Sequence, residues 1–180
     1  DGWAVLDLGS GNTITMHGIR SSDFDNTHFH VLPVTSNLIQ GGYNSDDTLI
    51  GTDANDRIEG SDNPFGRFED GYDILEGGKG DDVLIGGSNA SGSGGYVTDT
   101  YVFNSDSGND TIIGFLIDGT GFRGSYHDRL EVTKNLNGSS IDSAKDILDT
   151  ITETEDGWAV LDLGSGNTIT LHGISKNSIE

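Results

Sequence analysis

The sequence predicts a mainly all-β fold: a right-handed parallel β-roll or β-helix of nonapeptide repeats, with a capping β-hairpin and one short helix. Two observations predict it. Aspartates recur nine residues apart between Gly42 and Gly87, and an apolar residue follows two places after each. A longer motif, DGWAVLDLGSGNTITMHGI, spans residues 1–19 and recurs at 156–174 with Leu171 in place of Met16. Self-similarity at a fixed period is the sequence signature of stacked architectures.

The chain of 180 residues is strongly acidic, with 30 acidic and 9 basic side chains, a formal net charge of -21 and only 32% hydrophobic residues. This charge argues against a nucleic-acid partner, which requires a basic surface. No apolar run is long enough to span a membrane. Because the chain has no cysteine, it has no disulfide, thiolate zinc site or cysteine nucleophile. Low hydropathy with high like charge is typical of disordered chains, so we expect a cation to neutralise the carboxylates on folding.

The long motif suggests how the chain is organised. We expect residues 1–19 to be the terminal hairpin of a preceding repeat, followed by a linker or a strand leading into the next repeat (20–41). An acidic nonapeptide region (42–114) and a C-terminal region of strand, short helix and capping hairpin (115–174) would complete that repeat. Residues 175–180 would begin the next linker. The chain then contains the tail of one repeat and one full repeat of about 155 residues, part of a tandem array.

The nonapeptide region holds most of the acidity. Between Gly42 and Ile113 there are 12 aspartates and 3 glutamates against 3 basic residues, and 14 of the 28 glycines lie between Gly41 and Gly95. The clearest units read GTDANDRIE and GGKGDDVLI, and insertions around Asn63 and at 88–95 interrupt the phase. The aspartates at the sixth place, or at a related place beyond an insertion, are Asp47, Asp56, Asp73, Asp82, Asp99 and Asp110, and the apolar residues two places on are Leu49, Ile58, Leu75, Leu84, Tyr101 and Ile112.

Each unit has the residue types that a calcium-binding turn needs. Glycines permit positive φ and close approach of neighbouring backbones, which lets backbone carbonyls point at one place. An aspartate at a fixed offset adds a carboxylate, and six to eight oxygen ligands in a loose arrangement suit Ca²⁺. The last three residues, such as Val83–Ile85, form a very short strand whose central side chain points inward. Each unit is half a turn of the coil, so the calcium sites alternate between its two sides.

These units resemble the RTX, or haemolysin-type, calcium-binding repeats, over roughly 70 residues of the chain. The resemblance implies that turns two units apart share an ion. Carbonyls of Thr52 and Ala54 with the Asp56 carboxylate would bind one ion together with the carbonyls of Gly77 and Lys79 and the Asp82 carboxylate. Gly78, Gly80 and Asp82 would offer a half-site to a later turn, the one carrying Asp110. Gly71 and Asp73 would pair with Gly86 and Asp99, and Asp47 and Gly60 complete the expected ligands. Roughly four Ca²⁺ ions would offset about eight negative charges.

The resemblance also implies a function. RTX proteins leave bacterial cells by a type I pathway, so we expect a secreted or cell-surface, non-enzymatic module that folds on Ca²⁺ outside the cell. Its partners would be calcium and neighbouring repeats of the same chain, within a large adhesin, biofilm or surface protein. Two alternatives stand beside this one: an accessory module of a secreted epimerase, protease or lipase, and a glycan-binding module for extracellular polysaccharide.

The C-terminal region has ordinary secondary-structure signals. Asp128–Val132 alternates like a strand. Apolar residues at helical spacing from 141 to 151 predict a short amphipathic helix with Ser140 or Asp142 as N-cap. Residues 157–174 predict a hairpin in which Ala159, Leu161, Leu163, Ile169 and Leu171 share one face. We expect this hairpin to cover the open end of the coil, because a stacked array exposes its core unless it is capped.

Three other features are weaker candidates. His28 and His30 would face the same side of a strand, but no further zinc ligands lie near them in the sequence. The aromatic residues could form a sugar-binding platform, although packing against the hairpin is the simpler use; they are Trp3, Trp158, Tyr43, Tyr72, Tyr96 and Tyr126. No nucleophile–base arrangement is present, so we expect no catalytic site.

Overall fold

The chain divides into two units, Asp1–Leu32 and Pro33–Glu180, which are described separately from a computed structural model. The structure describes residues 4–7, 13–17, 20, 22, 37–43, 45–61, 71–87, 97–121 and 124–179. Within these residues no helix is long and apolar enough to cross a membrane. The predicted insertions around Asn63 and at 88–95 lie outside the described residues, as do His28, His30, Trp3 and Tyr96.

The first unit contains an antiparallel hairpin of β1 (Ala4–Asp7) and β2 (Thr13–Met16). Ala4 pairs with Met16, Val5 with Thr15 and Leu6 with Ile14. β2 alternates polar and apolar residues, and the glycine-rich sequence GSGN between the strands is typical of a hairpin connection.

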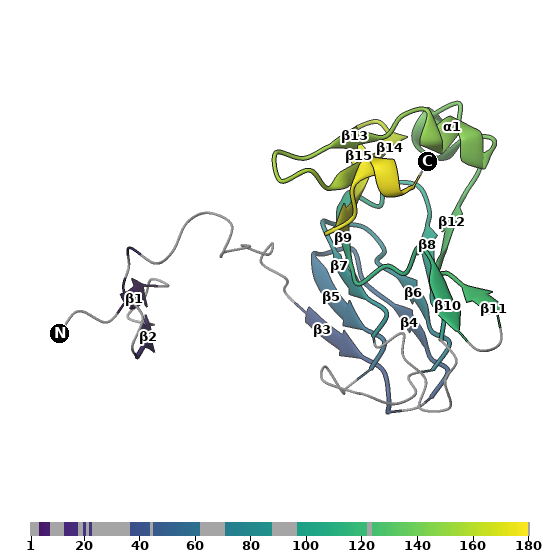
Figure 1. The fold of residues 1–180 in the computed structure, drawn as a ribbon. Coiled ribbons are helices and arrows are strands. Elements are labelled where there is room, and N and C mark those ends of the chain that lie inside the picture. Colours follow the sequence, from purple (N-terminus) through teal and green to yellow (C-terminus); the bar gives the residue numbers. More distant parts are fainter. Residues whose placement is uncertain are drawn as a thin grey trace. The chain divides into compact units, whose positions relative to one another are not determined.

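The second unit contains two sheets of short parallel strands (Figure 1). β3 (Asn37–Gln40), β5 (Asp56–Glu59), β7 (Val83–Ile85) and β9 (Asn109–Ile113) are parallel neighbours in one sheet. β4 (Thr48–Ile50), β6 (Ile74–Glu76), β8 (Thr100–Phe103) and β12 (Arg129–Val132) are parallel neighbours in the other. From β3 to β9 the chain alternates between the two sheets with every strand. The prediction of a mainly β fold with parallel strands is confirmed.

The core lies between these two sheets, and each of the strands β5 to β9 contributes at least one inward apolar residue to it. Five of the apolar residues that the sequence places two positions after an aspartate are fully buried, each 0% exposed: Ile58, Leu75, Leu84, Tyr101 and Ile112. Leu49, at the start of its sheet, is partly buried. Burying a side chain of this size stabilises the fold by about 1.5–3 kcal/mol. The register therefore follows from the hydrophobic pattern, because a one-residue slip would turn these side chains outward.

The predicted C-terminal hairpin is confirmed. β14 (Ala159–Gly164) pairs antiparallel with β15 (Asn167–His172), and β15 continues the first sheet by pairing in parallel with β9. A two-residue strand, β13 (Thr152–Glu153), pairs with the outer side of β14. The residues predicted to share one face are all buried: Ala159, Leu161, Leu163, Ile169 and Leu171. The hairpin, drawn in yellow-green in Figure 1, therefore lies at the end of the sheet where β9 would otherwise be an open edge.

The predicted strand from Asp128 to Val132 is confirmed as β12 (Arg129–Val132), and short additional elements precede and follow it. β10 (Gly119–Gly121) and β11 (Gly124–Tyr126) form a small hairpin within the connection from β9 to β12. A 3₁₀ turn, η3 (Leu136–Gly138), follows β12 and buries Leu136. A last 3₁₀ turn, η4 (Lys176–Ser178), follows the hairpin.

The predicted helix is present but shorter than its hydrophobic pattern suggests. α1 spans Ala144–Leu148, and its N-cap is Ser143, so the predictions of Ser140 and Asp142 were wrong. The Asp146 carboxylate accepts hydrogen bonds from the Ser143 N–H at 2.8 Å and the Ser143 hydroxyl at 2.7 Å. These two hydrogen bonds from Ser143 to the Asp146 carboxylate fix the first turn. Ile141 and Ile151 are buried outside the helix, so their helical spacing reflects two flanking segments packed on one core.

Candidate metal centre

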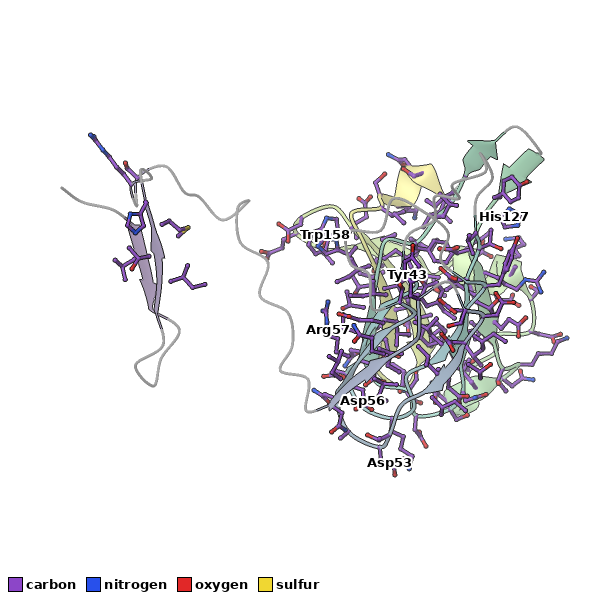
Figure 2. All side chains as sticks on the ribbon, turned by 90° about the horizontal axis from the view of Figure 1, so that it is seen from below. Tyr43, Asp53, Asp56, Arg57, His127 and Trp158 are labelled. Carbon is purple, nitrogen blue, oxygen red and sulfur yellow. The ribbon has the colours of Figure 1, made fainter. Side chains whose placement is uncertain are left out.

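The aspartates of the second unit form two rows, one at the starts of the parallel strands of each sheet. Asp56, Asp82 and Asp110 stand at the starts of β5, β7 and β9, and we call them the short-turn row because they follow the connections 51–55, 77–81 and 104–108. Figure 2 labels Asp56 and, at the outer tip of the turn before it, Asp53. The other row precedes β4, β6, β8 and β12 and consists of Asp47, Asp73, Asp99 and Asp128. We call it the long-turn row, since residues 60–73, 86–99 and 114–128 connect its strands.

Each row is held by a ladder of hydrogen bonds from backbone to carboxylate. In the short-turn row the Asp56 N–H donates to Asp82 Oδ1 at 2.8 Å, and the Asp82 N–H donates to Asp110 Oδ1 at 2.9 Å. Asn37 begins this ladder by donating from its side-chain amide to Asp56 Oδ1 at 2.8 Å. Because parallel strands in register place equivalent residues side by side, an aspartate at a fixed position near the start of each strand lies beside its counterpart on the next strand of the same sheet.

The long-turn row repeats the ladder. The N–H groups of Asp47, Asp73 and Asp99 donate to Oδ1 of the next aspartate at 2.9, 3.0 and 2.9 Å, respectively. The last acceptor is Asp128, which the sequence analysis did not identify as a site residue. Its signal is present in the sequence: it is the first residue of the predicted strand Asp128–Val132, and Leu130 follows it by two places. The insertion between Gly114 and Asp128 conceals the repeat, because it contains the β10–β11 hairpin.

The second carboxylate oxygens distinguish the members of the short-turn row. Asp56 Oδ2 accepts hydrogen bonds from the Thr52 N–H at 2.6 Å and the Thr52 hydroxyl at 2.8 Å. Oδ2 of Asp82 and Oδ2 of Asp110 are buried and, in the part of the chain that the structure describes, have no hydrogen-bond partner. A buried polar oxygen without a partner costs free energy, so these atoms mark where a ligand would be most stabilising.

Burial makes the charged form of these carboxylates unfavourable. It raises the pKa of Asp82 to about 6, and the nearby charges of Asp56 and Asp81 contribute to the rise. It raises the pKa of Asp110 to about 8, where the charge of Asp82 again contributes. Burial raises the pKa of Asp128 as well, at the end of the long-turn row. The backbone hydrogen bonds of the ladder oppose these rises in pKa but do not cancel them. A bound cation would restore the charged form.

The turns of the short-turn row stack closely on one another. The Lys79 N–H donates to the Thr52 carbonyl at 3.0 Å, and the Asp81 N–H donates to Asn55 Oδ1 at 3.0 Å. Gly78 and Gly80 have φ of 92° and 112°, which favour glycine. A Cβ on Gly80 would lie 2.7 Å from the Ala54 carbonyl carbon, and a Cβ on Gly77 would overlap Asp82 Oδ2. Because glycine has no Cβ, the backbone of the turn at Gly77 and Gly80 can lie close to the Asp82 carboxylate and to the Ala54 backbone.

The structure places some of the predicted calcium ligands of the short-turn row next to one another. Residues 52–56 lie against residues 77–82, and Gly80 lies against Gly108 of the turn that carries Asp110. The Thr52 carbonyl, an expected calcium ligand, accepts the Lys79 N–H, and the Asp56 carboxylate is hydrogen-bonded on both oxygens. The Asp82 and Asp110 carboxylates, with the Gly80 carbonyl near Gly108, are therefore the group of oxygen atoms in this row with the fewest hydrogen-bond donors around it.

The predicted ligands of the long-turn row fall into two groups. Gly86 lies beside Asp99 Oδ2, Gly60 lies beside Asp73 Oδ2 and the Gly86 carbonyl, and Asp73 and Asp99 are joined by the ladder. Gly71 instead packs against the Ser45 backbone, in the turn before Asp47. Asp47 Oδ2 accepts hydrogen bonds from the Gly42 N–H at 2.8 Å and the Ser45 hydroxyl at 2.7 Å.

Among the described residues there is no group of three or more histidine, aspartate or glutamate side chains that could hold a metal ion. The predicted sites are of a different kind, since each combines two carboxylates with backbone carbonyls. All their ligands would be oxygen atoms, a donor set that fits Ca²⁺ and disfavours softer metals. The chain matches no known protein-family model, and no curated protein matches it either.

Proposed function

We propose that the second unit is a calcium-dependent folding module, a right-handed β-roll of RTX type in which Ca²⁺ binds between successive turns. The observation that carries this proposal is the pair of neighbouring, buried carboxylates of Asp82 and Asp110, each with one oxygen that has no hydrogen-bond partner in the described chain. Two adjacent buried negative charges cost several kcal/mol unless a cation compensates them. Ca²⁺ would supply that charge and accept the nearby carbonyl oxygens as ligands.

The alternation of the strands supports a β-roll. Consecutive strands from β3 to β9 fall in opposite sheets, and strands two places apart pair in parallel. One coil then consists of two strands and two turns, so the aspartates fall alternately on two sides, as the two rows do. The right-handed sense is part of the proposal, because parallel crossover connections are right-handed in about 98% of cases.

Calcium binding would act as a switch for folding. With a net charge of -21, the chain without cations is disfavoured in a compact state by its own repulsion. At low calcium concentration it would remain unfolded, and at millimolar calcium outside the cell the free energy of binding becomes free energy of folding. The proposed role is that of a secreted, non-enzymatic structural repeat in a large extracellular adhesin, biofilm or surface protein.

A calcium titration followed by circular dichroism and calorimetry tests this proposal. In chelator we expect most of the β signal of the second unit and its cooperative thermal transition to be absent, and millimolar Ca²⁺ to restore both. Mg²⁺ at the same concentration is the matched control; it binds poorly where all ligands come from the protein. A chelated chain that keeps its full β signal and thermal transition would contradict calcium-driven folding.

A second candidate function, glycan binding, is favoured by one cleft. A cavity of about 450 Å³ lies beside the long-turn row, and its lining includes Tyr72, Tyr126, His127 and Arg129. Tyr72 is 57% exposed, and a tyrosine ring offers a sugar an apolar face with a polar tip. His127, labelled in Figure 2, lies between β11 and β12. Trp158 does not line this cleft; its ring lies 4.1 Å from that of His172.

Binding to alginate and to a neutral polysaccharide, measured in saturating calcium, separates the two functions. A glycan module would bind one of them and lose at least about tenfold in affinity on Tyr72→Ala. Tyr43→Ala is the matched control, because Tyr43 is equally exposed at 54% but does not line the cleft. No binding to either polysaccharide would exclude them as ligands and leave the calcium proposal intact.

A further inference from the structure

The last turn of the short-turn row, residues 104–108, differs in sequence from the two turns before it. The turns 51–55 and 77–81 begin with glycine, whereas this one reads NSDSG. Asp106 has φ of 64° at the place that Gly78 occupies in the preceding turn, and Gly108, at the place of Gly80, has φ of 84°. An aspartate adopts such a φ less readily than glycine does. This turn therefore has the positive φ values of its neighbour but only one of the two glycines that favour them.

Two asparagines from later in the chain hold these two positions. The Asp106 N–H donates to Asn137 Oδ1 at 2.6 Å, and the Gly108 N–H donates to Asn167 Oδ1 at 2.8 Å. Asn137 lies in η3, and Asn167 is the first residue of β15. The Thr168 N–H also donates to the Gly108 carbonyl, at 2.9 Å. Each of the two positive-φ residues of the last short turn is thus held by the side-chain oxygen of an asparagine.

The C-terminal hairpin fixes the two asparagines in turn. Asn167 is 8% exposed, and its side-chain amide donates to the Gly164 carbonyl at 2.9 Å. The Asn137 side-chain amide donates to the Leu163 carbonyl at 3.3 Å, and the Ser165 hydroxyl donates to the Asn137 backbone carbonyl at 2.7 Å. Because each amide N–H₂ group is bonded on one side, the side-chain oxygen is directed at the last short turn. Since β15 lies beside β9, the hairpin contacts this turn where a further turn of the row would lie.

We propose that Asn137 and Asn167 are positioning residues for the calcium site at Asp82 and Asp110, because they hold the last short turn in the shape that lets its carbonyls and the Asp110 carboxylate bind the ion. This inference rests on the proposed calcium binding of the second unit. Neither asparagine would be a ligand, since the side-chain oxygen of each already accepts a backbone N–H. Asp110 follows Gly108 by two residues, so a shift of the backbone at Gly108 would move the carboxylate and the carbonyls together. Because Ca²⁺ needs six to eight oxygen ligands, a relaxed turn would withdraw several at once.

Urea unfolding of full-length variants in saturating calcium tests this inference. Asn167→Ala leaves the part-buried Gly108 N–H without its acceptor and should lower the folding equilibrium constant about five- to thirtyfold. Asn137→Ala should lower it about three- to tenfold, because the Asp106 N–H bond that it removes is exposed. Asn177→Ala is the matched control, since Asn177 is exposed in η4, and it should leave the constant within about twofold.

Double-mutant cycles separate positioning of the ion site from simple support of the hairpin. Asp110→Asn removes a proposed ligand, so no ion remains at the site for the asparagines to position. In this background Asn167→Ala should cost at least about threefold less than it does alone. Asp47→Asn is the control background, because Asp47 precedes β4 at the opposite end of its sheet from β12. There the full cost of Asn167→Ala should remain, since distant changes are additive.

Equal costs of Asn167→Ala in all three backgrounds would mean that Asn167 only supports the hairpin. The inference would then be wrong, while calcium binding would stand. If Asp110→Asn does not fold, calcium titrations of the single variants replace the cycle. Asn167→Ala should then need about 1.5- to 3-fold more free calcium than Asn177→Ala for half of its β signal, and equal midpoints would overturn the inference. An unsubstituted chain that binds no calcium would contradict the proposed function itself, and this inference with it.

Discussion

The two aspartate rows share one ladder but differ in the turns that precede them. In both rows the backbone N–H of every aspartate but the last donates a hydrogen bond to the carboxylate of the next aspartate in the row, at 2.8–3.0 Å. In the short-turn row the turns themselves also stack, through contacts such as Lys79 N–H to the Thr52 carbonyl. Three turns of the long-turn row instead contain insertions, one of which forms the β10–β11 hairpin.

This difference separates the requirements of the hydrogen-bond ladder from those of the turns. The ladder depends only on strand register, so it survives insertions of any length that keep an aspartate immediately before the strand. Whether several backbone carbonyls point at one ion depends on the conformation of the turn. This conformation requires a short, glycine-rich turn. We therefore expect the short-turn row to bind calcium with more complete coordination, and the long-turn row to tolerate change better.

The largest expected effect is that of removing a short-turn carboxylate. Asp82→Ala should lose at least one bound Ca²⁺ and several kcal/mol of coupled folding free energy. Asp99→Ala, the matched change in the long-turn row, should cost about 1–3 kcal/mol, because it leaves the buried Asp73 N–H without its acceptor. Calcium stoichiometry by calorimetry and urea unfolding in saturating calcium measure both.

Asn variants separate the ladder from the charge. Asp82→Asn keeps an acceptor oxygen for the Asp56 N–H but has no negative charge, so it should lose the ion as Asp82→Ala does while losing less stability in saturating calcium. An unchanged number of bound ions in Asp82→Asn would contradict the assignment of Asp82 as a ligand. Equal costs for the Asp82 and Asp99 variants would remove the proposed difference between the rows.

The sequence predicted the ladder's aspartates and the core better than it predicted the elements around them. The nine-residue phase placed Asp56, Asp82 and the inward Ile58 and Leu84 correctly, because strand register and burial both follow local periodicity. It missed Asp128, since an insertion breaks the phase while the three-dimensional register continues. The helix boundary was misplaced for a similar reason: Ile141 and Ile151 are buried by tertiary packing outside α1, and hydrophobic spacing alone does not distinguish this from a longer helix.

The pH dependence of the calcium-free chain is the next expected effect. The unfolded chain has ordinary aspartates with a pKa of about 3.9, whereas burial raises the pKa of Asp82 to about 6 and of Asp110 to about 8 in the fold. The folded state then holds more protons between these values, so its stability is greatest below pH 4 and falls as the pH rises to about 8. Circular dichroism in chelator at pH 5, 6.5 and 8 measures this fall as a loss of the β signal, which should be largely absent at neutral pH.

Asp110→Asn should flatten the pH dependence, because it removes the group with the higher pKa. Asp128→Asn is the matched variant of the long-turn row, where burial also raises the pKa. A calcium-free chain whose stability increases from pH 5 to pH 8 would show that these carboxylates are not desolvated in the fold.

A smaller effect is expected from glycine substitutions. Gly80 and Gly114 both have positive φ, 112° and 82°, so alanine at either position costs about 1 kcal/mol in backbone strain. Only Gly80 faces the neighbouring turn, where a Cβ would lie 2.7 Å from the Ala54 backbone; at Gly114 nothing described lies within 4 Å. Gly80→Ala should therefore cost a further 1–3 kcal/mol or so from overpacking and weaken calcium binding. Equal thermal shifts for the two variants would show that the turns need not approach closely.

The smallest effect is expected at Lys79, although it is one of the proposed ligand positions. Its expected contribution is its backbone carbonyl, which Lys79→Ala retains. Its side chain is exposed and forms an ion pair with Asp53 at 3.0 Å, and that contact raises the pKa of the lysine. Exposed pairs of this kind add little to stability. Calcium affinity and stoichiometry should therefore match those of the unsubstituted chain within error, with Asp53→Ala as the reciprocal control. A lost ion in Lys79→Ala, with none lost in Asp53→Ala, would mean that side chains and not backbone shape the short turns.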